Sequence, residues 1–359
     1  MIPAEQHSTT IMKKVVGRFK EDIPVRNGFA GFFPSETTNT LLVDVEVERD
    51  TETIAVDVMR FTEGNRSKRT RHSEHTYEPP FYEELYDFAR DEVYMNSVAF
   101  GVMNSVGANQ AISQNALKNV RSNKKKILRA IRKQQADVLQ YGVVTLVNGD
   151  SIDYRRKPAS MVDLGVGNYW SESGAEIVNN LDAAMRFLRD EGNSTGEEIN
   201  LIMRNEAMNA FLRNDELKTI LNSRRMDRAK IVMPQFDKAT GMTFHGQVSA
   251  GDFNLNLWTY NEKYKTESGE IKYYLDRENA VIIPNDFQGK TVFGGLPYMR
   301  KARIGGADLK VPGVIEKDFL LRAYDDEKTI SSTLALSSAP LVIPFTVDKI
   351  VTLKVLATV

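Results

Sequence analysis

Cysteine is absent from all 359 residues of this chain. Disulfides, thiolate metal sites, iron–sulfur clusters and cysteine nucleophiles are therefore excluded. The sequence also contains no run of about 18 apolar residues, so we expect no membrane-spanning helix and no membrane partner. Its first residues lack the basic stretch and apolar core of a secretory signal, and we expect the chain to be made in a cytoplasm.

Familiar catalytic motifs are missing as well. No Walker-type phosphate loop occurs, and no glycine-rich dinucleotide turn follows a predicted strand. Ser249 lacks the upstream glycine of a nucleophile elbow. His72 and His75 have a spacing that suits a metal, but Arg69 and Arg71 beside them would repel a cation. We therefore predict no catalytic residues, no metal site and no cofactor, and interpret the chain as a protein that is not an enzyme.

The overall composition is that of an ordinary globular protein, with 42% hydrophobic and 26% charged residues. This excludes a disordered chain. The length exceeds what one hydrophobic core usually supports, which predicts two lobes. The 47 basic residues are balanced by 48 acidic ones, so only local clusters of charge can indicate a partner.

The N-terminal region has two parts with different patterns. Residues 1–38 mix prolines, glycines and phenylalanines without a sustained period, which predicts either an arm that needs a surface to lie on or a frayed terminus. From residue 43 to 48, valines alternate with Asp44, Glu46 and Glu48, and a second alternation follows over residues 54–58. This predicts a β-hairpin or two successive strands with one aliphatic and one acidic face.

A polar stretch, Thr62–Pro80, follows the ribbon and carries Arg66, Lys68, Arg69 and Arg71. A loop of this length in a compact domain is usually functional or disordered. Its basic residues could pair with the acidic ribbon within one chain or between copies, and a solvated loop is the alternative.

The strongest helical pattern covers residues 108–141. Apolar residues recur at steps of three and four, or sums of these, and Gly142 stands where a C-cap glycine is expected. Such a helix would be roughly 50 Å long and would act as a structural spine.

A basic stripe lies beside the apolar stripe of this predicted helix. Its members are spaced by 3, 4, 4 and 3 residues: Lys118, Arg121, Lys125, Arg129 and Arg132. Like charges at this spacing destabilise an isolated helix by about 0.2–0.5 kcal/mol per pair. We therefore predict that the stripe meets a polyanion or an acidic protein surface, with a merely solvated face as the alternative.

The rest of the chain predicts a mixture of helices and strands. We expect helices over Ala175–Glu191 and Asn205–Asn222, a strand over Glu198–Arg204, a hairpin formed by Phe319–Tyr324 and Ser332–Leu336, and a β-rich C-terminal tail.

In this order, the features resemble the major capsid protein of tailed double-stranded DNA phages, specifically the lambda-type capsid protein E family. The turn Asp163-Leu164-Gly165, the helix ending Leu217–Arg225 and the C-terminal Ser337–Leu341 stretch are similar to the family's pattern, whereas Glu316-Lys317-Asp318 departs from it. The resemblance covers nearly the whole chain and rests on the order and spacing of these motifs.

The resemblance implies an α+β fold of the Hong Kong 97 type. It divides the chain into an N-terminal arm (1–38), an extended β-ribbon and loop, the E-loop (39–82), a peripheral P domain with the spine helix (83–174), an axial A domain (175–312), a return hairpin of the P domain (313–338) and a β-tail (339–359).

The implied function is that of a major capsid protein, which self-assembles as hexamers and pentamers into the icosahedral shell of the virion. Besides copies of itself, the implied partners are a scaffolding protein, a portal, a decoration protein and packaged DNA bound without sequence specificity. Assembly would take place in the host cytoplasm. The basic stripe would face the DNA, while the arm, ribbon and basic loop would contact neighbouring subunits. The alternatives are an encapsulin-like host compartment and, more remotely, a soluble enzyme.

Overall fold

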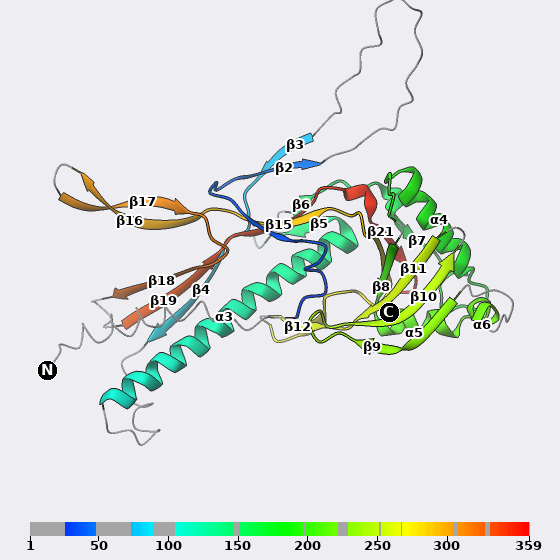
Figure 1. The fold of residues 1–359 in the computed structure, drawn as a ribbon, viewed down its shortest axis with the longest axis horizontal. Helices are drawn as coiled ribbons and strands as arrows, with labels where there is room; N and C mark the ends of the chain where they lie inside the picture. Colours follow the sequence, from blue (N-terminus) through cyan, green and yellow to red (C-terminus); the bar gives the residue numbers. More distant parts are fainter. Residues whose placement is uncertain are drawn as a thin grey trace, which may run out of the picture.

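A computed structural model of the chain describes residues 26–47, 73–88, 105–146, 151–196, 198–221, 229–250, 253–266, 268–304, 307–326 and 331–358. The fold is a mixed α+β arrangement in which one long helix, α3, runs from an outlying small sheet into the main body (Figure 1).

The helices are α3 (Ser105–Tyr141), α4 (Ile177–Asp190), α5 (Asn205–Arg213) and α6 (Asp215–Leu221), with short 3-10 turns η1 (Pro158–Ser160) and η2 (Val347–Lys349). The strands of the first half are β1 (Ser35–Thr37), β2 (Val43–Val47), β3 (Ser73–Tyr77), β4 (Tyr82–Phe88), β5 (Val143–Thr145), β6 (Ser151–Asp153), β7 (Met161–Asp163), β8 (Glu198–Met203), β9 (Ala229–Phe236) and β10 (Met242–Ala250). Those of the second half are β11 (Phe253–Tyr260), β12 (Lys263–Lys265), β13 (Ile271–Tyr273), β14 (Asn279–Pro284), β15 (Gly289–Phe293), β16 (Leu296–Ile304), β17 (Ala307–Ile315), β18 (Leu320–Asp326), β19 (Ser331–Ser338), β20 (Pro340–Pro344) and β21 (Val351–Lys354).

The predicted spine helix is confirmed as α3, which has 37 residues and spans about 55 Å. It ends at Gly142, whose φ of 70° favours glycine and whose N–H donates to the Val138 carbonyl at 2.9 Å. A Cβ at residue 142 would also collide with the side chain of Arg156. Both constraints explain why a glycine follows the helix.

The main body is built on a seven-stranded sheet with the order β7-β21-β14-β8-β11-β10-β9. Helices α4, α5 and α6 cover one face of this sheet (Figure 1). The apolar stripe of α4, including Leu181, Met185 and Leu188, packs there against Leu201 and Leu257 of the strands. Strand β21 belongs to this sheet, so the C-terminal tail returns into the body formed by the middle of the chain.

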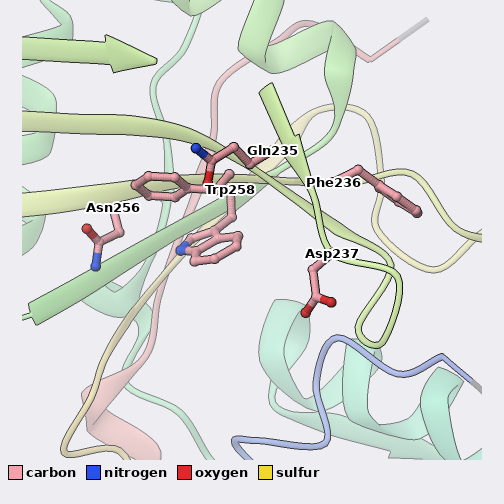
Figure 2. Close-up of a pocket in the computed structure, with 6 residues that line it drawn as sticks. Gln235, Phe236, Asp237, Asn256 and Trp258 are labelled. Atoms are coloured by element: carbon pink, nitrogen blue, oxygen red, sulfur yellow. The ribbon is translucent and has the colours of Figure 1, made fainter. Parts of the chain in front are cut away.

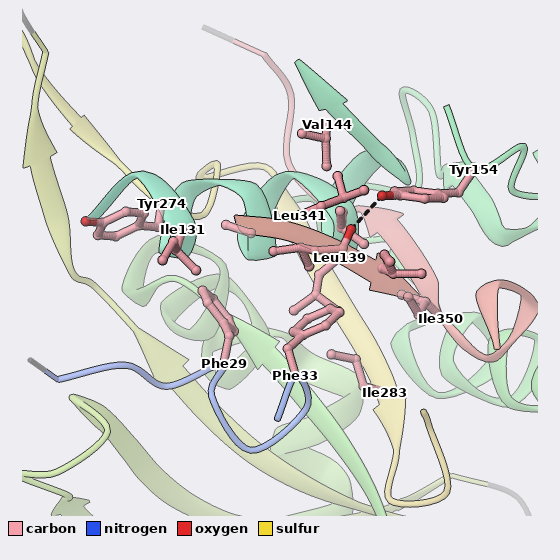
Figure 3. Close-up of a cluster of buried hydrophobic side chains, with 14 of the residues drawn as sticks. Phe29, Phe33, Ile131, Leu139, Val144, Tyr154, Tyr274, Ile283, Leu341 and Ile350 are labelled. Atoms are coloured by element: carbon pink, nitrogen blue, oxygen red, sulfur yellow. Dashed lines mark hydrogen bonds between the residues drawn. The ribbon is translucent and has the colours of Figure 1, made fainter. Parts of the chain in front are cut away.

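The second and larger core lies between the C-terminal half of α3, the sheet β1-β15-β20 and the other face of the seven-stranded sheet. Figure 3 shows Ile131 and Leu139 of α3 beside Leu341 of β20, with Phe29 and Phe33 entering from the N-terminal segment. The Tyr154 hydroxyl donates to the Val342 carbonyl at 2.6 Å and holds the loop after β6 against β20.

Part of the predicted arm therefore belongs to this core. Phe29 and Phe33 are 0% and 1% exposed, and β1 pairs in parallel with β15. This corrects the expectation that residues 26–38 lack a local partner, because two aromatic side chains bury enough apolar surface to order them on their own subunit. Residues 1–25 lie outside the described residues.

The N-terminal half of α3 has a thinner support, the three-stranded sheet β18-β19-β4. Among the side chains that the structure describes in this half, a small cluster is buried, formed by Ala116, Leu117 and Val120 of the helix with Leu334 of β19. Strands β18 and β19 pair antiparallel, which confirms the predicted C-terminal hairpin.

Two other predictions differ in detail, and a third lies outside the described residues. Strand β2 pairs with β3, so residues 73–77 form a strand although they were expected in a loop; the expected second alternation at 54–58 lies outside the described residues. The helix predicted over 205–222 is two helices, because Asn214 takes an extended ψ of 139°. Its Oδ1 accepts the Glu216 N–H at 2.9 Å, which starts α6.

Candidate interaction surfaces

The basic stripe of α3 does not have one uniform environment. Lys118 and Arg129 are exposed, whereas Arg121 and Lys125 are half-buried. These four residues lie along one side of the helix, as the spacing predicts. They span about three turns of the helix.

Arg132 is the exception, since its side chain is only 4% exposed. The guanidinium carbon lies 4.9 Å from the centroid of the Tyr274 ring, and Nε finds no hydrogen-bond acceptor among the described residues. The loop before β14 covers this turn of the helix, so the structure removes Arg132 from the accessible stripe. In the folded subunit Arg132 supports packing, through a cation–π contact.

Other cations of α3 contact the small sheet. The Lys126 ammonium lies 2.7 Å from a carboxylate oxygen of Glu84 on β4, and the Lys124 ammonium lies 4.7 Å from the centroid of the Phe319 ring. Lys124 and Lys126 therefore interact with residues of their own subunit. Among the stripe residues, Lys118 and Arg129 are the ones whose side chains are exposed.

The C-terminal end of α3 is held by a buried arginine, Arg156. Its guanidinium donates to the Leu139 and Gln140 carbonyls of the last helical turn at 3.0 and 3.2 Å, and to the Ile350 carbonyl at 3.0 Å. Burial lowers the pKa of Arg156 to about 10. A positive charge at a helix C-terminus interacts favourably with the helix dipole, so Arg156 fastens the spine helix to the strand β21 region.

The sequence reasoning did not identify Arg156 or the two buried phenylalanines as key residues. A signal for Arg156 was available, because Ile152, Tyr154 and Arg156 alternate and all three are buried. The polar loop that follows obscured this pattern. For Phe29 and Phe33, the surrounding glycines and prolines masked any periodicity.

The predicted inter-subunit residues are only partly described. Asp44 and Glu46 occupy alternate positions of β2 and share one face of the β2–β3 ribbon. Glu48 and the loop residues Arg66, Lys68, Arg69 and Arg71 lie outside the described residues.

A shallow pocket of about 420 Å³ opens on the sheet face near β9–β11 (Figure 2). Phe236, Phe244 and Trp258 form its apolar part, and the Trp258 Nε1–H donates to Asn200 Oδ1 at 3.0 Å. Its carboxylate, Asp237, accepts hydrogen bonds from the Ala239 N–H and the Thr240 hydroxyl, both at 2.8 Å, and these bonds lower its pKa. The lining thus combines aromatic and amide groups with a carboxylate engaged in its own turn.

A second pocket of about 360 Å³ lies where α3 meets β12 and β13. Burial raises the pKa of Asp137 in its lining, although the Lys133 ammonium binds this carboxylate and counteracts the shift. Within the described ranges, no three histidine, aspartate or glutamate side chains come together as a metal site. No helix among the described elements has a stretch apolar and long enough to cross a bilayer.

Comparison with known proteins identifies both family and fold. The sequence model of a family described as phage major capsid protein E matches residues 20–355. No curated protein matches the chain.

Two solved structures are similar over nearly their full length. One is described as a prophage capsid protein from Escherichia coli CFT073, with a TM-score of 0.59 and 16% identity, covering 96% of this chain and 99% of that one. The other is a phage-related protein from Bordetella bronchiseptica RB50, with a TM-score of 0.52 and 9% identity, covering 95% and 96%. The α+β fold of the Hong Kong 97 capsid type is confirmed.

Proposed function

Because this chain belongs to the phage major capsid protein E family, we propose that it assembles as hexamers and pentamers into the icosahedral shell around the double-stranded DNA of a tailed phage. The match to residues 20–355 is the observation that carries this proposal. Family and fold indicate a structural rather than a catalytic protein, one that associates with copies of itself and resides in the virion. We further propose assembly in the host cytoplasm with a scaffolding protein, a portal and a decoration protein.

The arrangement of helices and strands supports a division of the chain into the proposed domains. The expected boundary at 174/175 precedes α4, whereas those at 82/83 and 312/313 fall inside β4 and β17. Under the proposal, α3 and the sheet β18-β19-β4 form the P domain, and the seven-stranded sheet with α4–α6 forms the A domain. The acidic ribbon at Asp44, Glu46 and Glu48 and the loop at Arg66, Lys68, Arg69 and Arg71 would contact adjacent subunits.

The basic side of α3 supports the proposal that this helix lies on the inner surface of the shell, next to the packaged DNA. Lys118, Arg121, Lys125 and Arg129 would bind phosphates without reading base sequence, since contacts to phosphate oxygens carry no sequence information. Binding a polyanion would also offset the repulsion among these charges. Arg132 is left out of this set because it is buried.

Purified protein should form closed shells with a native mass of many subunits, visible by negative-stain electron microscopy. A strictly monomeric chain, or particles that enclose an enzyme instead of DNA, would contradict the proposed function.

A triple variant tests the DNA-facing surface: Lys118→Gln, Lys125→Gln and Arg129→Gln. We expect the variant to form normal empty shells but to package fewer genomes. In a binding titration, the slope of log affinity against log salt concentration should become shallower by about 0.9 for each lost phosphate contact. The matched control replaces three exposed cations elsewhere, Arg186, Lys218 and Lys272, with Gln. Loss of shells in the α3 variant alone would show instead that the stripe pairs with an acidic neighbouring subunit.

A further inference from the structure

The pocket beside Trp258 belongs to a larger uncovered area of the seven-stranded sheet. Helices α4–α6 cover one face of this sheet, and the larger core covers part of the other face, around Met242, Tyr260 and Ile202. Further along that second face, strands β8 to β11 carry side chains that are exposed or half-buried. The strand register shows how these side chains are arranged.

Two rows of side chains run across this area, which we call the open face. In the first row, Gln235, Phe244 and Trp258 are neighbours on β9, β10 and β11. The second row takes one residue from each of four strands: Lys230, Gln247, Asn256 and Asn200. The register of β10 shifts at His245, and this bulge brings Phe244 and Gln247 to the same face.

The first row forms an aromatic platform. The centroids of the Phe244 and Trp258 rings lie 4.9 Å apart, and the rings are tilted by 53°. In Figure 2 the Gln235, Asn256 and Trp258 side chains lie close together, whereas the Phe236 ring points away from them. The pocket of about 420 Å³ at this place has a volume in the range of small-molecule sites, roughly 300–1,000 Å³. A half-buried indole ring can offer a flat apolar surface to a ligand ring.

Asparagine side chains beside the platform supply hydrogen-bond donors. Three of their amides on this face accept a bond through Oδ1: Asn200 from the Trp258 Nε1–H at 3.0 Å, Asn256 from the Gln247 amide at 2.9 Å, and Asn254 from the Ser249 hydroxyl. The Nδ2 groups of these three asparagines bind no acceptor among the residues that the structure describes. Each Nδ2 group can donate two hydrogen bonds, so the open face presents available donors next to an aromatic ring.

We propose that the open face binds a neutral saccharide that carries acetamido groups. The apolar side of a sugar ring stacks on Trp258, while ring hydroxyls and acetamido carbonyls accept hydrogen bonds from the asparagine amides. An acetamido group joins a carbonyl acceptor to an apolar methyl group, which matches amide donors beside an aromatic ring. Because the pocket is shallow, we expect a Kd on the order of 1 mM.

The charges of the open face favour an uncharged ligand. Lys230 is the single cation of the two rows, and the nearby Asp237 carboxylate is already bound by the Ala239 N–H and the Thr240 hydroxyl. Nucleic acids gain their affinity from several lysine and arginine contacts, which these rows do not supply. An extended peptide would pair with the edge strand β9 rather than lie across the face of the sheet.

The test compares two trisaccharides with the same backbone. Triacetylchitotriose carries an acetamido group on each ring where cellotriose carries a hydroxyl. Tryptophan fluorescence of unassembled full-length subunits follows binding, because the second of the two tryptophans, Trp170, is 1% exposed and lies in the core on the opposite side of the sheet. We expect triacetylchitotriose to change the emission with a Kd on the order of 1 mM, and cellotriose to bind at least about fivefold more weakly.

An isosteric variant, Gln235→Glu with Asn256→Asp, keeps the shape and the acceptor oxygens but removes the NH₂ donors. It should weaken the binding of triacetylchitotriose about tenfold, because the lost donors leave ligand acceptors unpaired. The matched control, Asn179→Asp with Asn209→Asp, makes the same change at exposed positions of α4 and α5 and should bind like the unmodified chain. Gln235→Glu alone, at an exposed position, should weaken binding about threefold and serves if the double variant does not fold.

Four results would overturn the inference. They are no binding of triacetylchitotriose by the unmodified chain, equal affinity for the two trisaccharides, unchanged affinity in the folded amide variants, and displacement of the saccharide by a short single-stranded oligonucleotide in a salt-dependent manner. The titration uses unassembled subunits, so its outcome is independent of whether the chain forms shells, which tests the proposed function separately.

Discussion

The two halves of α3 carry side chains at the same helical spacing but lie in different surroundings. Near the N-terminal half, Lys118 is exposed and a small cluster joins the helix to three strands. Near the C-terminal half, Arg132, Gln135, Leu139 and other residues are buried among segments from all parts of the chain. The comparison shows that a stripe of equal spacing can start on the surface and end in the core.

We expect the largest effect where the N-terminal segment packs against the buried half of α3. Phe33→Ala should lower the free energy of unfolding by about 3–5 kcal/mol, because the cavity lies in a well-packed core. Phe81→Ala is the matched control, since Phe81 is 48% exposed, and should cost less than about 1 kcal/mol. Urea denaturation of unassembled subunits measures both. Equal costs for the two variants would mean that residues 26–38 do not anchor the subunit.

An intermediate effect is expected at the fastening of the helix end. Arg156→Met removes the donor for the Leu139, Gln140 and Ile350 carbonyls and should cost about 2–4 kcal/mol, since buried acceptors lose their partners. Arg186→Met is the control: Arg186 is 71% exposed and paired with Asp182 in the same helix, so the change should cost about 0–1 kcal/mol. Hydrogen exchange at the last turn of α3 should rise in the first variant. Unchanged exchange there would refute a fastening role.

The smallest effect compares two members of the stripe directly. Arg132→Gln should cost about 1–2 kcal/mol, because it removes a buried aliphatic stem and a cation–π contact with Tyr274. Arg129→Gln, one turn earlier and exposed, should change stability by less than about 0.5 kcal/mol but weaken binding to duplex DNA. Thermal unfolding and a DNA-binding titration separate the two outcomes. Weaker DNA binding by the Arg132 variant at unchanged stability would return Arg132 to the accessible surface.

The local sequence pattern predicted the structure best where neighbouring residues determine it. The length of α3, its glycine stop and the hairpin of β18 and β19 all follow from periodicity and turn chemistry within a few dozen residues. Asn214 shows the limit: the apolar spacing continues across it, but its side chain starts a new helix by binding the Glu216 N–H. A residue that can either continue or cap a helix leaves the periodicity unchanged.

The sequence predicted less well which strands pair with each other. Strand β2 has an alternation that predicts a ribbon, yet its partner β3 lies in a stretch rich in charged and polar residues. Register depends on which segment completes the sheet, and a polar strand gives a weak local signal.

The sequence by itself determined which segments are helices or strands and which residues share a face of each. Through the order of its motifs it also indicated the capsid family. Only the tertiary structure decided which residues of a face are buried and which are exposed. Arg129 and Arg132 differ in exposure because the loop with Tyr274 covers one and not the other, and Phe29 is core because α3 and β20 enclose it. Periodicity fixes an angle around a helix or strand, whereas burial depends on segments distant in sequence that pack against that angle.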